Sequence, residues 1–221
     1  MSTTETDALT DTPFSARIRE ATMSAHRAAE RSSFVHRLMR GQLDLDAVAD
    51  LVAQHHAIYT ALERTGDALA DDPVVAPFLG AELRRVPALE SDLGSLVGDD
   101  WAGRTRVLPA TTAYAEGISS TVTTPERFVA HHYTRLLGDL SGGQMIRRTL
   151  ERHYGDRVDG ALTFYDFDGV EDLDAYKEAY RARLDGAPWD DARRDAFIDE
   201  VNRAYECNSD VFLALDAAHP A

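Results

Sequence analysis

The segment from Pro125 to Tyr154 constrains the fold most strongly, because it has the pattern of one long helix with three glycines near its middle. Thr124 supplies a capping hydroxyl, Pro125 suits the first helical position, and Glu126 suits the positive end of the helix dipole. Each glycine in a helix interior costs up to about 1 kcal/mol relative to alanine. We therefore expect the glycines to allow a bend or the close approach of a ligand or another backbone.

Helical geometry places the unusual residues of this segment together. At about 100° per residue, a face about 140° wide holds Arg135, Gly138, Asp139, Gly142 and Gly143. This face combines a smooth floor with a carboxylate and a guanidinium, which suits a planar ligand. A tight contact between two helices explains the same spacing equally well, so both explanations stay open at this point.

The remaining chain predicts further helices. From Asp44 onward, Val48, Leu51, Tyr59 and Leu62 recur at helical spacing, as in an amphipathic helix. The predicted helices span residues 13–31, 44–71, 80–97, 109–119, 125–154, 171–185 and 190–215. Only residues 161–167 (ALTFYDF) could form a strand, and they fit a packed connector equally well. These patterns predict an all-α protein.

The domain organisation follows from length and composition. With 221 residues and 44% hydrophobic residues, the chain suits a single globular domain. We expect this domain at 13–215, a disordered lead at 1–12 and a tail at 216–221. No apolar run reaches the ~18 residues of a membrane span, and the start lacks a signal-peptide pattern, which favours a cytoplasmic protein. The only cysteine, Cys207, excludes an internal disulfide and cysteine-based metal sites.

The net charge of −15 argues against nucleic acid as a partner, because phosphate would be repelled. Basic residues nevertheless occur in local groups, at Arg17 and Arg19, at Arg147 and Arg148, and at Lys177, Arg181 and Arg183. Solvated helix faces are the simple interpretation of these groups. The alternative is that several of them converge on an anionic ligand.

One histidine has a distinctive neighbour. His26 and Glu30 are four residues apart, so they share a helix face. The carboxylate can accept the N–H of the imidazole while the other ring nitrogen binds a metal, although a surface pair has the same spacing. The competing candidates are the adjacent histidines His55, His56, His131 and His132. Because His132 shares the apolar side of its helix with Phe128, we expect it to make a core contact.

Several longer motifs together resemble the haem oxygenase family over roughly residues 14–215. They are REATMSAHRAAE, IYTALE, HHYTRLLGDLSGGQMIRR, FYDFDGVEDLDAYKEAYRARL and AYECNSDVF, in that order. GDLSGG after YTRLL is the most specific of them. The resemblance implies an all-α fold that holds haem between a proximal N-terminal helix and a glycine-bearing distal helix.

The resemblance also implies roles for individual residues. His26 matches the ligand of the haem iron, and Glu30 matches the carboxylate that orients it. Asp139 matches the residue that organises distal water and supports proton delivery, with Arg135 and Tyr59 as partners. The distal glycines that pack against haem and oxygen correspond to Gly138, Gly142 and Gly143.

Further residues are implied to contact the cofactor. Lys177 and Arg181 match residues that bind the haem propionates, and Arg19 could do the same. Tyr133 matches an aromatic contact on the distal helix. The distal wall on the last helix corresponds to Tyr205, Asn208 and Phe212. Tyr205 departs from the phenylalanine of relatives, and Met23 replaces a residue that is often polar or basic.

The implied activity is oxidative cleavage of haem to biliverdin, carbon monoxide and ferrous iron. It consumes O2 and electrons, which we expect from an external NADPH- or ferredoxin-linked reductase because the sequence has no flavin or nicotinamide motif. Arg147, Arg148 and Lys177 could dock an acidic donor. One alternative is a haem-binding or carrier protein without turnover, which would not need Asp139, Arg135 and Tyr59 together. Another is a non-haem enzyme, such as a thiaminase-like hydrolase or a di-metal oxidase.

Overall fold

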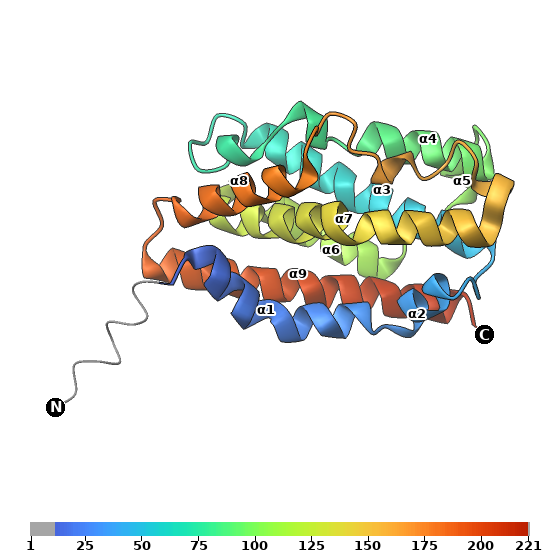
Figure 1. Ribbon diagram of the computed structural model, residues 1–221, viewed down its shortest axis with the longest axis horizontal. Helices are drawn as coiled ribbons and strands as arrows, with labels where there is room; N and C mark the ends of the chain where they lie inside the picture. Colours follow the sequence, from blue (N-terminus) through green and yellow to red (C-terminus); the bar gives the residue numbers. More distant parts are fainter. Residues whose placement is uncertain (1–11, 221) are drawn as a thin grey trace.

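The protein is a bundle of helices, and the expected all-α class is confirmed. The computed structural model describes residues 12–220, and no strand occurs in that range (Figure 1). The α-helices are α1 Phe14–Glu30, α2 Ser33–Met39, α3 Leu45–Ala68, α4 Val86–Val97, α5 Trp101–Arg104, α6 Pro109–Ser120, α7 Pro125–Tyr154, α8 Leu173–Asp185 and α9 Asp191–Ala218. The short 3-10 turns are η1 Ala76–Phe78, η2 Ala81–Leu83, η3 Thr121–Thr123, η4 Gly155–Val158 and η5 Thr163–Tyr165.

Local capping explains where several helices begin. The Asp44 carboxylate accepts a hydrogen bond from Ala47 N at 2.9 Å at the start of α3. Asp190 does the same for Arg193 N at the start of α9, also at 2.9 Å. The helix α7 spans the predicted residues 125–154. The expected lead at 1–12 lies almost wholly outside the described residues.

Several helix boundaries differ from the sequence prediction. The helix predicted from residue 80 begins at Val86, because Pro87 lacks an N–H and is tolerated only in the first turn. The short helices α2 and α5 were not predicted. At the start of α2, Ser32 Oγ accepts a hydrogen bond from Val35 N at 3.3 Å. The sequence analysis did not identify this helix cap. The last helix continues to Ala218, beyond the predicted end at 215.

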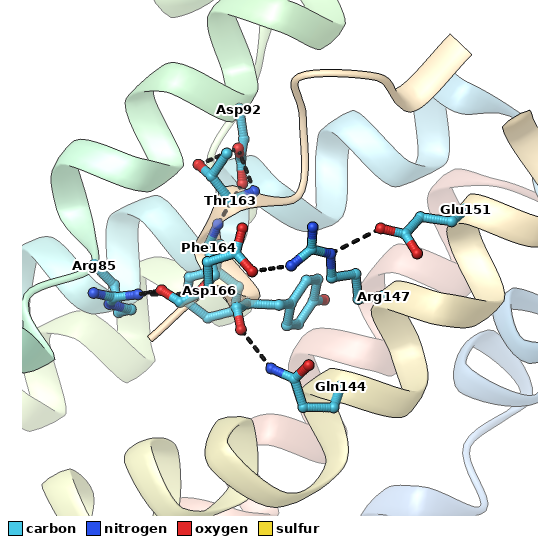
Figure 2. A network of polar contacts seen from close by, with 9 residues as sticks. Arg85, Asp92, Gln144, Arg147, Glu151, Thr163, Phe164 and Asp166 are labelled. Atoms are coloured by element: carbon cyan, nitrogen blue, oxygen red, sulfur yellow. Dashed lines mark hydrogen bonds and ion pairs between the residues drawn. The ribbon is translucent and has the colours of Figure 1, made fainter. Parts of the chain in front are cut away.

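Residues 161–167 form a buried connector instead of a strand. Leu162 adopts a left-handed conformation (φ 70°), and η5 follows it directly. The Asp92 carboxylate of α4 accepts from Thr163 N at 2.8 Å and from Phe164 N at 2.9 Å (Figure 2). On the other side, Gln144 of α7 donates to Tyr165 O at 2.6 Å. The connector is therefore held between α4 and α7.

The last helix, α9, organises the functional part of the bundle. It packs against both α1 and α7, which lie along it in Figure 1. Buried polar contacts reinforce this packing, because His131 of α7 lies 2.9 Å from Glu200 of α9 and Arg127 donates to the same carboxylate at 2.7 Å. No helix within residues 12–220 is both long and apolar enough to cross a membrane.

Candidate functional site

The three glycines of α7 have two different surroundings. A Cβ added to Gly138 or Gly142 would meet no atom within 4 Å, so both leave an open face on the helix. A Cβ on Gly143 would lie 2.7 Å from Cδ1 of Tyr165 in the connector. The close approach of the connector therefore requires a residue without a side chain at Gly143, and the predicted contact of Gly143 with a ligand stays a prediction. The open space at Gly138 and Gly142 is compatible with a ligand, and the close contact at Gly143 is with the connector and not with a second helix.

Beside the open face, four side chains from three helices form a buried polar network. The Tyr59 hydroxyl of α3 donates a short hydrogen bond to Oδ2 of Asp139. Arg135 Nη2 lies 3.4 Å from the same oxygen, and Arg135 Nη1 donates to Asn208 Oδ1 of α9 at 2.9 Å. The guanidinium carbon is also 5.4 Å from the centre of the Tyr59 ring. The structure thus brings together Asp139, Arg135 and Tyr59, which the resemblance placed in one hydrogen-bond network, and it adds Asn208, which was expected in a distal wall.

Burial and charge shift the ionisation of this network. Burial raises the pKa of Asp139, although Arg135, the Tyr59 hydrogen bond and Arg85 act in the opposite direction. Burial and the charge of Asp139 hold the pKa of Tyr59 well above its usual value. Tyr59 is therefore a neutral donor, whereas Asp139 ionises closer to neutrality than an exposed aspartate does. A buried carboxylate with a raised pKa is suited to proton exchange.

The network also reaches a residue that sequence analysis missed. Tyr114 of α6 is buried, and neither its hydroxyl nor Nε of Arg135 has a hydrogen-bond partner within residues 12–220. Burial raises the pKa of Tyr114, and the positive charge of Arg135 opposes this shift. Buried polar groups without a protein partner mark places where a ligand or water completes the bonding. Only the helical spacing of its apolar neighbours signals Tyr114 in the sequence.

On α1, His26 has one shielded and one accessible ring nitrogen. Its buried Nδ1 lies 3.5 Å from Glu30 Oε2, an electrostatic contact longer than a formed hydrogen bond. The side chain keeps 39% of its surface exposed, which leaves Nε2 as the accessible nitrogen. The Tyr205 ring meets the imidazole edge-on, with centroids 5.3 Å apart. This arrangement fits an axial ligand oriented from its Nδ1 side.

The competing histidines have other partners. Burial holds the pKa of His55 well below its usual value, and its ring packs against Phe164. His132 Nδ1 lies 2.9 Å from the Tyr180 hydroxyl, so the expected core contact is confirmed. His131 pairs with Glu200, and His56 lies 3.4 Å from Glu90 at the surface. Within residues 12–220, no three His, Cys, Asp or Glu side chains are grouped to hold a metal ion.

Two of the predicted propionate-binding cations act on the same tyrosine of α7. Burial raises the pKa of Tyr133, and the charges of Arg181 from α8 and Arg19 from α1 both oppose this shift. One turn before Arg181, Lys177 Nζ pairs with Asp174 at 2.7 Å. Cations from two helices thus converge beside α7, as an anionic ligand requires.

The residues predicted to form one wall on α9 lie on one face of that helix, because they are three and seven residues apart. Asn208 Oδ1 accepts from Arg135 of the distal network, whereas the Tyr205 ring contacts His26. Phe212 stacks on Phe34 of α2, with centroids 6.4 Å apart. Because α9 packs against α1, α2 and α7, side chains of this one face meet three different helices, and their contact with a ligand stays a prediction.

Comparisons with known proteins agree on one family. A family model described as Heme oxygenase matches residues 12–214. Heme oxygenase 1 of the cyanobacterium Synechocystis is 32% identical over 90% of this chain and 83% of its own length. Heme oxygenase 1 of Gallus gallus is 35% identical over 90% of this chain and 68% of its own length. The crystal structure of heme oxygenase-1 from Synechocystis in complex with heme superposes with a TM-score of 0.88, at 31% identity, over 94% of each chain.

Proposed function

Because this chain belongs to the haem oxygenase family, we propose that it cleaves haem at the open face of Gly138 and Gly142, with His26 as the iron ligand. The reaction takes haem, O2 and electrons to biliverdin, carbon monoxide and ferrous iron. Bound haem supplies the oxygen and redox chemistry, and the protein supplies binding, orientation and protons. The residues fit this group, because the glycine face is open, His26 keeps an accessible nitrogen, and cations converge beside Tyr133.

The observation that carries the proposal is the buried network around Asp139. A carrier protein needs an axial ligand and a cradle, but it does not need a buried carboxylate of raised pKa beside that cradle. Tyr59 and Arg135 hold the Asp139 carboxylate in place from two sides. Asp139 can therefore take up and return a proton next to the glycine face, directly or through water. Asn208 fixes the guanidinium of Arg135 from the far side.

On the proximal side, we assign binding and orientation to other residues. Glu30 holds the imidazole of His26 from Nδ1, and Tyr205 supports the edge of the same ring. On the distal helix α7, Tyr133 contributes aromatic surface, and Phe212, which stacks on Phe34, contributes it from α9. Arg19, Lys177 and Arg181 bind the haem propionates, for which Lys177 exchanges its present partner, Asp174.

We assign the electron supply to an external donor protein. Of the cations expected to dock an acidic donor, Arg147 is already paired with Glu151 at 2.8 Å and with Asp166. Lys177 is paired with Asp174, whereas Arg148 on α7 is exposed. Arg148 is therefore the member of this group best placed to meet a donor. If Arg148 docks the donor, Arg148→Glu should lower the rate of biliverdin formation with a reductase but not with ascorbate.

The function is tested by visible spectroscopy on the haem-loaded chain. After haemin is added, a Soret band reports binding, and ascorbate in air should replace it with a biliverdin band. His26→Ala should lose the axial-ligand signature, whereas His36→Ala, a change of an exposed histidine on α2, should behave like the wild type. Asp139→Ala should keep the Soret band but form biliverdin roughly 100-fold more slowly, the scale of an acid–base contribution.

Two outcomes would contradict the proposal. A Soret band that persists in ascorbate and air, with no biliverdin, would instead support a carrier without turnover. A normal yield of biliverdin from Asp139→Ala would remove the role of the carboxylate while leaving haem binding intact.

A further inference from the structure

A cavity of about 270 Å³ lies on another side of α7, between that helix, α3 and residues 79–84. On α7 it is bounded by His132 and Leu136, which are about 120° around the helix from Gly138 and Gly142. The cavity is therefore distinct from the open glycine face. Its lining is mainly apolar and includes Leu62, Leu79 and Leu83.

Among the residues that line this cavity, His132 offers a neutral polar group. The residue is 6% exposed, and its Nδ1 is 2.9 Å from the Tyr180 hydroxyl. The contact with Tyr180 uses Nδ1, which leaves Nε2 to bond a ligand in the cavity that His132 lines. Burial lowers the pKa of His132 to about 4, so the ring is neutral at physiological pH. A neutral ring suits an uncharged hydrogen-bonding group rather than an anion.

The charged groups at the cavity mouth already neutralise one another. Arg84 pairs closely with Asp67, and its other guanidinium nitrogen lies 3.5 Å from Glu63. The second oxygen of Glu63 accepts hydrogen bonds from the backbone N–H groups of Arg85 and Val86, at 2.6 and 3.0 Å. A charged ligand would have to break these contacts. The mouth therefore favours a neutral molecule.

We propose that this cavity is a second ligand site, which binds a neutral bicyclic aromatic molecule carrying one hydroxyl or similar polar group. An apolar cavity of about 150 Å³ is sufficient for benzene, so 270 Å³ accommodates a second ring. The polar group bonds His132, and the rings pack against the leucines. The inner wall includes Tyr59, whose hydroxyl donates to Asp139, so the site shares a residue with the distal network.

The test uses 2-naphthol with the full-length chain and no added haem, so that it does not depend on the proposed function. Binding is measured by calorimetry and by amide chemical shifts. Ala70 is exposed at the cavity mouth, and Ala70→Leu should fill that mouth without disturbing the core. Ala68→Leu is the matched control, because Ala68 is also exposed but does not line the cavity.

We expect saturable binding of one 2-naphthol, with shifts grouped at residues 59–84 and 132–136. Ala70→Leu should weaken the affinity about tenfold through steric overlap, and Ala68→Leu should leave it unchanged. Naphthalene, which lacks the hydroxyl, should bind about fivefold more weakly, as expected for one lost hydrogen bond. Absence of saturable binding, equal binding to Ala70→Leu or to naphthalene, or shifts centred on residues 138–142 would overturn the proposal.

Discussion

Among single residues, Asp139 has the greatest chemical consequence, because burial and charge act on its ionisation in opposite directions. Burial raises its pKa, and the Arg135 guanidinium and the Tyr59 hydroxyl oppose the rise. The carboxylate is thus held in a state from which proton uptake is less costly than from an exposed aspartate. This property belongs to the arrangement of the three side chains, since an exposed Asp–Arg pair would shift the pKa the other way.

The Tyr59→Phe variant tests this arrangement. The Tyr59 hydrogen bond lowers the pKa of Asp139, so its removal should raise that pKa further. Activity that requires ionised Asp139 is complete above this pKa and is lost as pH falls through it. The acid limb of biliverdin formation should therefore lie above the ordinary aspartate range near about 3.9 and move to higher pH in Tyr59→Phe.

The measurement is the initial rate against pH, with ascorbate as reductant and haem loaded beforehand. Tyr176→Phe, on α8 and outside the network, serves as the control and should keep the wild-type profile. An acid limb that stays in place in Tyr59→Phe would show that Asp139 does not control the profile.

Among the elements, α7 contains glycines in two opposite surroundings. A side chain has space at two of them and would clash with the connector at the third. Gly138 and Gly142 leave a face open, so a methyl group there meets no protein atom. Gly143 instead lies against the Tyr165 ring, which Gln144 and Asp92 hold in the connector through neighbouring backbone groups (Figure 2). One helix segment therefore leaves space on one side and packs closely against the connector on the other.

Alanine substitutions should distinguish these two surroundings. Without haem, Gly138→Ala should raise the free energy of unfolding by up to about 1 kcal/mol, because alanine favours a helix and the added methyl has space. Gly143→Ala should lower it by about 1–3 kcal/mol, because the connector must move away.

Urea unfolding of the two variants gives both values. Haem binding and turnover should respond in the opposite order. Gly138→Ala should reduce them more than Gly143→Ala does, although it does not destabilise the fold. Equal destabilisation by the two alanines would contradict the division of the glycines into two groups.

For the whole molecule, the local charge at the proposed haem edge differs from the overall charge. The chain carries a net charge of −15, which repels an anionic ligand at long range. Arg19 and Arg181, from helices distant in sequence, nevertheless converge beside Tyr133. Packing of α1 against α8 brings them together, so a local cationic site exists on an acidic protein.

Haem affinity should depend on these two cations. The double variant Arg19→Gln, Arg181→Gln should bind haemin about tenfold more weakly at low ionic strength, and the difference should shrink as added salt screens the exposed charges. Arg64→Gln, at an exposed arginine of α3, changes the net charge but not this cluster. If Arg64→Gln lost half as much binding free energy as the double variant, the effect would come from net charge alone.

The sequence by itself determined the bounds of α7 and the side-chain contacts that depend only on residues within a few helical turns. The contact of His26 with Glu30 and the pairing of Arg135 with Asp139 follow from the i,i+4 geometry. The bounds of α7 follow from its helical pattern and from Pro125 in the first turn, whereas the expected hydroxyl cap is wrong, because Thr124 makes no capping hydrogen bond. The family resemblance added the expectation that Tyr59 and Asn208 join the distal group. The contacts within α1 and α7 were predictable because an isolated helix already defines them, whereas the places of Tyr59 and Asn208 came only from the resemblance.

Only the tertiary structure decided which helix each side chain meets. It placed Tyr205 against His26, Gly143 against Tyr165, and Tyr114 beside the distal network, none of which the sequence predicted. The physical reason is that contacts between distant segments depend on how each helix is rotated and seated against its neighbours, and many arrangements satisfy the same apolar spacing. The distal glycine segment therefore acquired its two separate roles only when the connector folded against one side of it.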